Sequence, residues 1–204
     1  MASGQSLGAF LEERLFAPLD MRDTGFFVDG ADRARLATVY RSEGGALSPL
    51  PEGPRVEGHL VFSPSYPYSD AGAGRRRYES GGAGLVTTAR DYARFCQMLA
   101  SGGELDGRRL LSRKTVELMA ANHLAGLDAE GFAFGLGLGL AQDPGLSGEI
   151  QSAGTLGWAG FYTTRFWIDP AEDFIGVILT QTYPFGSGRA LDRLPVLAYQ
   201  AIDD

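Results

Sequence analysis

The residues best suited to chemistry form a glycine-flanked segment, Gly157-Trp158-Ala159-Gly160, followed by Phe161. Two runs of β-forming residues come next, so the segment is predicted to lead into a hairpin. A carbonyl that becomes an oxyanion needs fixed N–H donors about 3 Å away, and a glycine at position 160 lets an acyl group approach the strand without meeting a Cβ. The alternative is that Trp158 and Phe161 are core aromatics at the start of a strand.

A nucleophile for such a carbonyl is harder to find. Lys114 is the only lysine, and the residue three positions before it is Leu111, so the sequence holds no Ser-x-x-Lys pair. Residues 4–8 fit the Gly-x-Ser-x-Gly pattern of an α/β-hydrolase nucleophile elbow, with one of the two histidines as base. That elbow needs a buried strand before the serine, whereas only three residues precede the motif. Ser6 is therefore predicted to be a helix N-cap.

Composition narrows the classes of partner and cofactor. The chain has 204 residues, 44% of them apolar, which is enough for one domain with a real core. Its net charge of −7 argues against nucleic acid or an anionic membrane as partner. One cysteine and two histidines disfavour a zinc site, and no apolar stretch reaches the roughly 20 residues of a membrane span. We expect a soluble chain without a metal, and its compartment, cytoplasmic or periplasmic, stays open.

Helices are predicted where a capping residue precedes apolar residues spaced by three and four. Cys96 falls on the apolar stripe of one of them, so we expect a buried structural thiol. The predicted helices cover residues 7–17, 89–101, 113–122 and 191–202, the last with Pro195 in its first turn.

Strands are predicted in the second half of the chain. Residues 132–140 alternate glycine with Phe or Leu, which indicates one strand whose glycine side lets a backbone or a ligand approach. Residues 161–168 and 174–180 flank Asp169-Pro170 and form a predicted hairpin. Residues 41–80 are rich in Gly, Pro and Ser, and are expected to be a long loop that is functional or held by a part outside this sequence.

Several segments, in their order and spacing, resemble the superfamily of serine β-lactamases, penicillin-binding proteins and family VIII carboxylesterases, and most closely its class C and esterase branch. The resemblance covers nearly the whole chain, but only the C-terminal portion of the family. The matching segments are residues 15–21, 23–26, 79–88, 91–103, 135–137, 157–160 and 166–170.

The resemblance implies roles for the segment described first. In that superfamily a serine attacks an ester or lactam carbonyl, a lysine three residues later and a tyrosine move protons, and a β-strand closes the site. The esterase-like branch opens this strand with Trp-x-Gly. By resemblance, Trp158, Ala159 and Gly160 position the substrate, and the backbone N–H of Phe161 donates to the oxyanion. Weaker candidates for the cleft are Tyr162 and residues 80–84.

The resemblance begins after the points where the Ser-x-x-Lys and tyrosine motifs would lie. Tyr68-Ser69-Asp70 is similar to the tyrosine motif but lies on the wrong side of residues 15–21. The predicted fold is α/β (α+β), an antiparallel sheet flanked by helices that lacks the N-terminal helix and first strands of the family. We expect residues 1–125 to be mostly helix and loop, and residues 126–204 to hold the sheet strands and the terminal helix.

Two functions remain open at this point. The chain is predicted to be the C-terminal part of a serine hydrolase, inactive alone, that transfers an acyl group to water once an N-terminal fragment completes it. Its substrate would be a small ester or lactam, with the ester favoured because Trp158 replaces the cation that meets a lactam's carboxylate. No cofactor is implied. The alternative is a noncatalytic binding or interaction module. An uncovered sheet face would also favour self-association.

Overall fold

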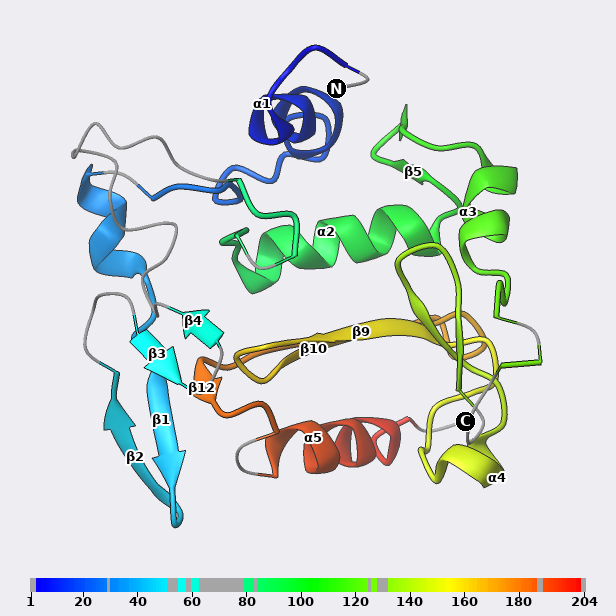
Figure 1. Ribbon diagram of the computed structural model, residues 1–204. Helices are drawn as coiled ribbons and strands as arrows, with labels where there is room; N and C mark the ends of the chain where they lie inside the picture. The colour runs from blue at the N-terminus through cyan, green and yellow to red at the C-terminus, as the bar shows by residue number, and fades with distance from the viewer. Residues whose placement is uncertain are drawn as a thin grey trace.

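The computed structural model describes residues 3–28, 30–50, 55–57, 60–62, 79–82, 84–124, 126–127, 132–186 and 189–202. Its centre is a five-stranded antiparallel sheet that lies between helix α2 (Ala89–Ala100) on one face and helix α5 (Ala190–Tyr199) on the other (Figure 1). The predicted antiparallel sheet flanked by helices is confirmed. The predicted division near residue 125 stays a prediction.

The central sheet has the order β11-β10-β9-β8-β7. Its hairpin around Asp169-Pro170 is confirmed, but the first strand of that hairpin starts later than predicted because residues 161–163 form a turn. The strands are β7 (Phe132–Phe134), β8 (Gly139–Ala141), β9 (Leu156–Gly160), β10 (Thr164–Asp169) and β11 (Phe174–Leu179).

The single strand predicted over residues 132–140 is wrong, because the chain reverses there into the β7–β8 hairpin. The amide of Gly135 donates to the carbonyl of Leu138 at 2.7 Å, and Gly137 takes a φ of +81°, a conformation that glycine adopts without strain. A Cβ at Gly135 would collide with the backbone carbonyl of Met119. The predicted close approach of another backbone to this glycine is therefore confirmed.

The long loop predicted over residues 41–80 is wrong in part. Gly44 and Gly45, with φ values of +57° and +86°, close a hairpin between β1 (Tyr40–Glu43) and β2 (Ala46–Pro49). Strand β1 also pairs in parallel with the distant β12 (Thr182–Tyr183). Residues 68–70, the tyrosine-like motif, lie outside the described residues. The remaining short strands are β3 (Arg55–Glu57), β4 (Leu60–Phe62), β5 (Glu104–Leu105) and β6 (Arg108–Arg109).

Three of the predicted helix starts are confirmed by their caps. The hydroxyls of Ser6, Thr88 and Ser112 each accept a hydrogen bond from the backbone amide three residues later. The fourth helix, α5, begins at Ala190 and ends at Tyr199, and Pro195 lies inside it and not in its first turn as predicted. The other helices are α1 (Leu7–Leu11), its π-helical continuation Glu12–Phe16, a 3-10 helix at Gly30–Arg35, α3 (Arg113–Met119) and α4 (Pro144–Ser147).

The two faces of the central sheet have separate cores. On the α2 face, Leu156, Phe166 and Ile168 pack in a cluster with the helix residues Cys96 and Leu99. Burial raises the pKa of the Cys96 thiol to about 12, so the predicted structural thiol is confirmed. On the α5 face the buried cluster is smaller, and consists of Trp167, Ile178 and Leu191. No helix in the described parts of the chain has the length and apolarity that crossing a membrane requires.

The turn between β9 and β10 is held in an unusual conformation at Thr163, a fully buried residue with a φ of +62°. A β-branched residue rarely adopts this left-handed region, so the surroundings must hold it there. The Thr163 hydroxyl donates to the carbonyl of Thr182 at 3.1 Å and accepts from the amide of Gly186 at 3.2 Å. The Thr180 hydroxyl donates to the Thr163 carbonyl at 2.7 Å.

The other end of the β10–β11 hairpin is held by the buried carboxylate of Asp169. It accepts hydrogen bonds from the amide of Ser152 at 2.9 Å, the hydroxyl of Tyr199 at 2.7 Å and the amide of Ala171 at 3.1 Å. Burial alone would raise the pKa of Asp169, but these hydrogen bonds outweigh it and lower the pKa below its ordinary value. Asp169 thus ties helix α5 to the sheet through Tyr199.

Thr163→Val should destabilise the turn while keeping its shape. The carbonyl of Thr182 and the amide of Gly186 lose their partner, so we expect the free energy of unfolding in urea to fall by about 1–3 kcal/mol. Thr164→Val is the matched control, because the Thr164 hydroxyl makes no side-chain hydrogen bond among the described residues; its change should stay below about 0.5 kcal/mol. Equal losses in the two variants would contradict the role given to the Thr163 hydroxyl.

Asp169→Asn should destabilise the chain in a pH-dependent way. The side-chain amide of asparagine would turn its NH₂ group toward one of the donors that bond the carboxylate. We therefore expect the free energy of unfolding in urea at pH 7 to fall by about 1–3 kcal/mol. The lowered pKa of Asp169 makes its contribution complete above about pH 4, the ordinary pKa, and reduces it as the pH falls through the folded-state value. The gap between wild type and Asp169→Asn should therefore shrink in acid. Asp173→Asn, on the exposed turn, is the control; a gap constant with pH would refute the assignment.

Candidate functional site

The candidate site lies where strand β9 loses one of its two neighbours. Strand β10 pairs with β9 along its whole length, from Leu156 to Gly160. Strand β8 pairs only with Leu156 and Gly157. Within the described residues, no strand continues the ladder on that side beyond Gly157. We call this stretch of β9, from Trp158 to Phe161, the β9 margin.

The turn after β9 sets the direction of the N–H and C=O groups at the end of this strand. The carbonyl of Gly160 accepts from the amide of Thr163 at 3.0 Å, and Thr163 has the left-handed φ of a three-residue hairpin loop. Gly160 therefore turns its N–H and C=O toward β10. Because these groups alternate along an antiparallel strand, those of Ala159 and the N–H of Phe161 point to the β9 margin.

The two aromatic side chains of the margin are exposed at the surface. The Trp158 side chain is 48% exposed and packs edge to face on Phe134, with ring centroids 4.9 Å apart. Phe161 is 42% exposed and contacts Tyr162 and Tyr183, each with a centroid distance of 5.2 Å. These rings flank the margin and are not core aromatics at a strand start, the alternative raised from the sequence.

Gly160 has a structural reason to be glycine besides the approach of a ligand. A Cβ at this position would collide with the hydroxyl of Thr164, its partner across the β9–β10 ladder. The sequence argument, which considered only an incoming acyl group, was therefore incomplete. The glycine keeps the hairpin end closed, and the hairpin end positions the amide of Phe161.

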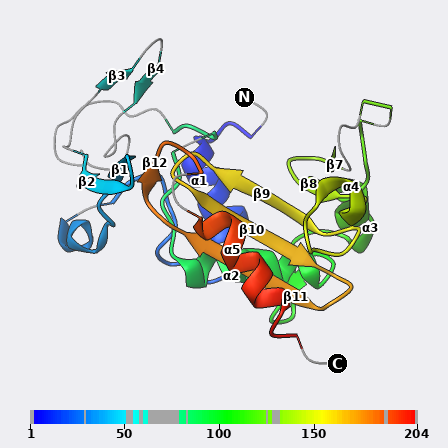
Figure 2. The same cartoon turned by 90° about the horizontal axis from the view of Figure 1, so that it is seen from below.

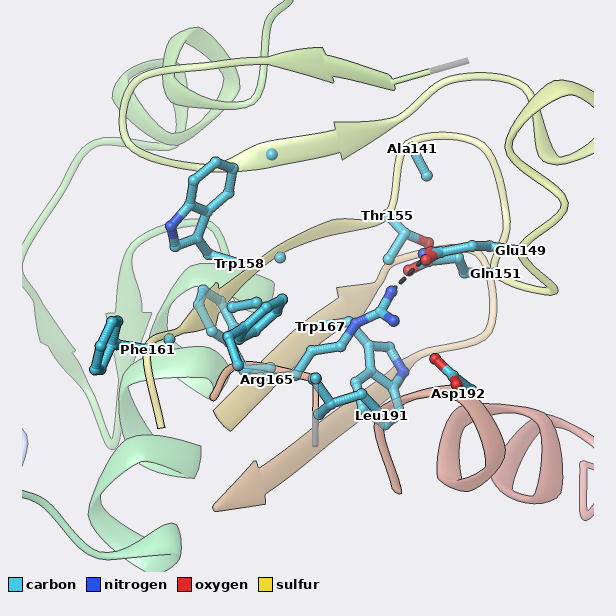
Figure 3. A pocket seen from close by; sticks show the side chains of 17 residues that line it. Ala141, Glu149, Gln151, Thr155, Trp158, Phe161, Arg165, Trp167, Leu191 and Asp192 are labelled. Atoms are coloured by element: carbon cyan, nitrogen blue, oxygen red, sulfur yellow. Dashed lines mark hydrogen bonds and ion pairs between the residues drawn. The ribbon is translucent and has the colours of Figure 1, made fainter. Parts of the chain in front are cut away.

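A pocket of about 650 Å³ runs along β9 on the α5 face of the sheet (Figure 3). Arg165 crosses it and forms an ion pair with Glu149 at 2.7 Å. The sequence analysis missed this pocket, although a lone arginine inside a β-rich run is a signal that could have pointed to it. Leu191 and Asp192 of α5 form one side of the pocket. The pocket is lined by Gly139, Ala141, Glu149, Gln151, Thr155, Gly157, Trp158, Ala159, Gly160, Phe161, Arg165, Phe166, Trp167, Phe185, Gly186, Leu191 and Asp192.

The other candidate residues have local contacts that give them structural roles. The hydroxyl of Ser6 caps α1 and hydrogen-bonds Glu79 at 3.2 Å, so Ser6 is the predicted N-cap and not the serine of a nucleophile elbow. Glu79 also accepts from the amide of Gly8 at 2.7 Å, which places the start of residues 80–84 beside α1. His123 contacts the carbonyl of Leu118 through Nε2 at 2.8 Å, and His59 lies outside the described residues.

The β9 margin offers hydrogen-bond donors of the backbone and an aromatic surface for a substrate. Backbone N–H groups aimed at one place can stabilise a developing oxyanion, and the exposed aromatic rings can position an acyl or alcohol group. The residues that line the pocket and the margin include no serine, cysteine or lysine. Within the described residues, the site thus offers hydrogen-bond donors and aromatic surfaces but no serine, cysteine or lysine as nucleophile.

Comparisons with known proteins identify the family of this chain. A family model described as beta-lactamase matches residues 1–200. The esterase EstB of Burkholderia gladioli is 34% identical over 195 residues, which cover 89% of this chain and 45% of EstB. An uncharacterized protein of Mycobacterium tuberculosis is also 34% identical, over 85% of this chain and 43% of its own length.

A solved structure shows the same fold. EstCE1, described as a hydrolase with promiscuous acyltransferase activity, superposes with a TM-score of 0.80 at 29% identity, over 97% of this chain and 51% of that protein. This chain therefore spans about half the length of the relatives that it matches. The resemblance inferred from the sequence segments is confirmed, and the chain belongs to the beta-lactamase family.

Proposed function

We propose that this chain forms one side of the active site of a serine hydrolase of the β-lactamase and carboxylesterase type. This side hydrogen-bonds the oxyanion and positions the substrate. The attacking serine, with its lysine and tyrosine, would come from a polypeptide outside this sequence. The observation that carries the proposal is the β9 margin, where the amide of Phe161 points away from β10, in a chain without a Ser-x-x-Lys pair. The 34% identity to an esterase supports it.

The proposed reaction is acyl transfer through a serine ester. The serine oxygen adds to the ester carbonyl as its proton passes to the lysine and tyrosine relay, and the carbonyl oxygen becomes an oxyanion. The N–H of Phe161 hydrogen-bonds this oxyanion, which then reforms the carbonyl and expels the alcohol with the relayed proton. Water repeats the sequence on the acyl-enzyme and releases the acid. No metal or organic cofactor takes part.

An ester is the favoured substrate class for two reasons. By the resemblance, Trp158 replaces the cation that a lactam-processing site would present to the substrate's carboxylate, and its exposed indole offers an apolar surface instead. EstB is named an esterase and EstCE1 a hydrolase with acyltransferase activity, which also makes an alcohol a possible acyl acceptor in place of water.

A noncatalytic binding module is the second candidate, because the chain as given lacks the nucleophile motif. Such a module would keep the pocket along β9 but complete no acyl transfer with any partner. Reconstitution separates the two candidates, since only the hydrolase gains ester cleavage when a serine-bearing half is added.

The isolated chain should show no serine-hydrolase activity. Incubated with a fluorophosphonate probe, it should remain unlabelled by mass spectrometry, and nitrophenyl esters should hydrolyse at the buffer rate. The physical reason is that Ser6, the serine of the elbow-like motif, is a helix N-cap whose hydroxyl accepts from the amide of Ala9 and donates to Glu79, and no histidine or lysine contacts it among the described residues. Stoichiometric labelling of Ser6 would overturn the assignment.

Reconstitution tests the oxyanion donor directly. We expect nitrophenyl acetate hydrolysis to appear when this chain is co-expressed with the half of EstB that it does not match. In that complex Phe161→Pro should lower kcat about 10²–10³-fold, because it removes the N–H while proline suits the second position of this turn. Phe161→Leu keeps the N–H and is the matched control, expected within about fivefold of wild type. Equal losses in both variants would assign Phe161 to packing and not to the oxyanion.

A further inference from the structure

Two strands from distant parts of the chain meet beside the β9 margin. The main chain of β1 pairs in parallel with β12, with Arg41 opposite Tyr183. The amide of Thr182 donates to the carbonyl of Tyr162 at 3.1 Å, which joins β12 to the turn after β9. Figures 1 and 2 both show β1 and β12 side by side, next to one end of the central sheet. Side chains of β1 and β12 therefore lie close to the turn that carries the Phe161 amide.

Three side chains form a stack that ends at the β9 margin. The guanidinium of Arg41 lies over the ring of Tyr183, 5.7 Å from the ring centroid. The ring of Tyr183 contacts that of Phe161, with centroids 5.2 Å apart and planes inclined by 30°. Both distances are typical of attractive cation–π and aromatic contacts. We call Arg41, Tyr183 and Phe161 the aromatic stack.

The members of the aromatic stack differ in how their backbones are held. Arg41 and Tyr183 lie in strands that pair with each other, and the Arg41 side chain, which is 27% exposed, also pairs with Glu43 at 3.0 Å. Phe161 comes directly after the last residue of β9, and within the described residues no strand pairing includes it. The position of Phe161 therefore depends on the hydrogen bonds of the turn and on the contacts of its ring.

The position of Phe161 matters because its amide is the proposed oxyanion donor. Such a donor is effective when it already points at the developing charge and needs no reorganisation during the reaction. The hydrogen bonds of Thr163 set the direction of the turn. A ring that is held on one face restricts the movement of its own Cα, and so of the amide nitrogen attached to it. Contacts that lock a first group in this way keep its geometry within the narrow range that catalysis needs.

We propose that Tyr183 and Arg41 are positioning residues for the oxyanion donor. Tyr183 holds the ring of Phe161, and Arg41 holds the ring of Tyr183 from its other contact. Neither side chain has to touch the substrate, and neither lines the pocket along β9. The inference rests on the proposed function, because it assigns the Phe161 amide to ester cleavage. It gives the β1–β2 hairpin a role in supporting the active site.

Backbone relaxation measures the hold on Phe161 without any enzyme activity. Labelling with ¹⁵N-phenylalanine marks the 12 phenylalanines of the chain, and Phe161→Leu assigns the wanted amide by removing its signal. We expect an order parameter of about 0.85 in the wild type and a fall toward about 0.6 in Tyr183→Leu, which keeps an apolar side chain but removes the ring. Tyr183→Phe keeps the ring and is the matched control, expected to equal the wild type. An unchanged order parameter in Tyr183→Leu would overturn the proposal.

Kinetics of the complex with the unmatched half of EstB test the effect on the reaction. Loss of one ring contact corresponds to about two- to tenfold in an equilibrium constant. We therefore expect Tyr183→Leu to lower kcat for nitrophenyl acetate about three- to fivefold and to leave KM within about twofold, because the donor acts in the transition state. Tyr183→Phe should match the wild type. A raised KM with unchanged kcat would assign Tyr183 to substrate binding and overturn the proposal.

Substitutions of Arg41 separate its charge from its length. Arg41→Met keeps a long apolar side chain but removes the cation, so we expect kcat to fall in the same direction as in Tyr183→Leu, by about twofold. Arg41→Lys keeps a cation that can lie over the ring and is the matched control, expected to retain the wild-type kcat. Equal kcat losses in the two variants would contradict the role given to the cation of Arg41.

A double substitution tests whether the ring of Phe161 carries the effect. If Tyr183 acts through that ring, Tyr183→Leu should cause no further loss of kcat in a Phe161→Leu background, where the N–H is kept and the ring is gone. Full additivity of the two losses would show that Tyr183 acts elsewhere and would overturn the proposal.

The outcomes keep the positioning role and the proposed function apart. A complex that cleaves no ester contradicts the hydrolase, whereas a lowered order parameter in Tyr183→Leu still supports the hold of the aromatic stack on Phe161. An ester-cleaving complex whose kcat does not respond to Tyr183→Leu supports the hydrolase and contradicts the positioning role.

Discussion

The direction of the amides at the end of β9 depends on the left-handed backbone of one buried residue, Thr163. A β-branched side chain in this conformation carries strain, and here the hydroxyls of Thr180 and Thr163 itself hold it in place against the backbone of Thr182 and Gly186. This turn closes the hairpin so that Gly160 faces β10. The alternation of an antiparallel strand then aims the Phe161 amide at the opposite side. A different turn would reverse that direction and remove the donor from the margin.

A second constraint is the shortness of β8, which shapes both faces of the site. Its pairing with β9 ends at Gly157, so the rest of β9 keeps one side free of a strand partner within the described residues. The same short strand contributes only the small residues Gly139 and Ala141 to the α5 face, where they line the pocket along β9. The β9 margin and the pocket therefore share strand β9.

The elements that were predicted correctly are those with local causes. A serine or threonine that accepts from the amide three residues later needs no distant partner, so the caps at Ser6, Thr88 and Ser112 were readable. The reversal within residues 132–140 was not, because it depends on Gly135 meeting the carbonyl of Met119. The parallel pairing of β1 with β12 joins residues far apart in the chain, and no local pattern marks it. The predicted place of Pro195 in the first turn was also wrong, because five residues of α5, from Ala190 to Leu194, precede it.

From the sequence alone, the family, the glycine-flanked segment at residues 157–160 and the absence of a Ser-x-x-Lys pair could be determined, because each is a matter of residue type and spacing. Only the tertiary structure decided that Trp158 and Phe161 are exposed, and that Arg165, Glu149 and Asp192 surround one pocket. The tertiary structure also shows that the buried indole N–H of Trp167 has no hydrogen-bond partner among the described residues. Residue type sets what a group can donate or accept, whereas long-range packing sets which groups meet, and that information is spread over the whole chain.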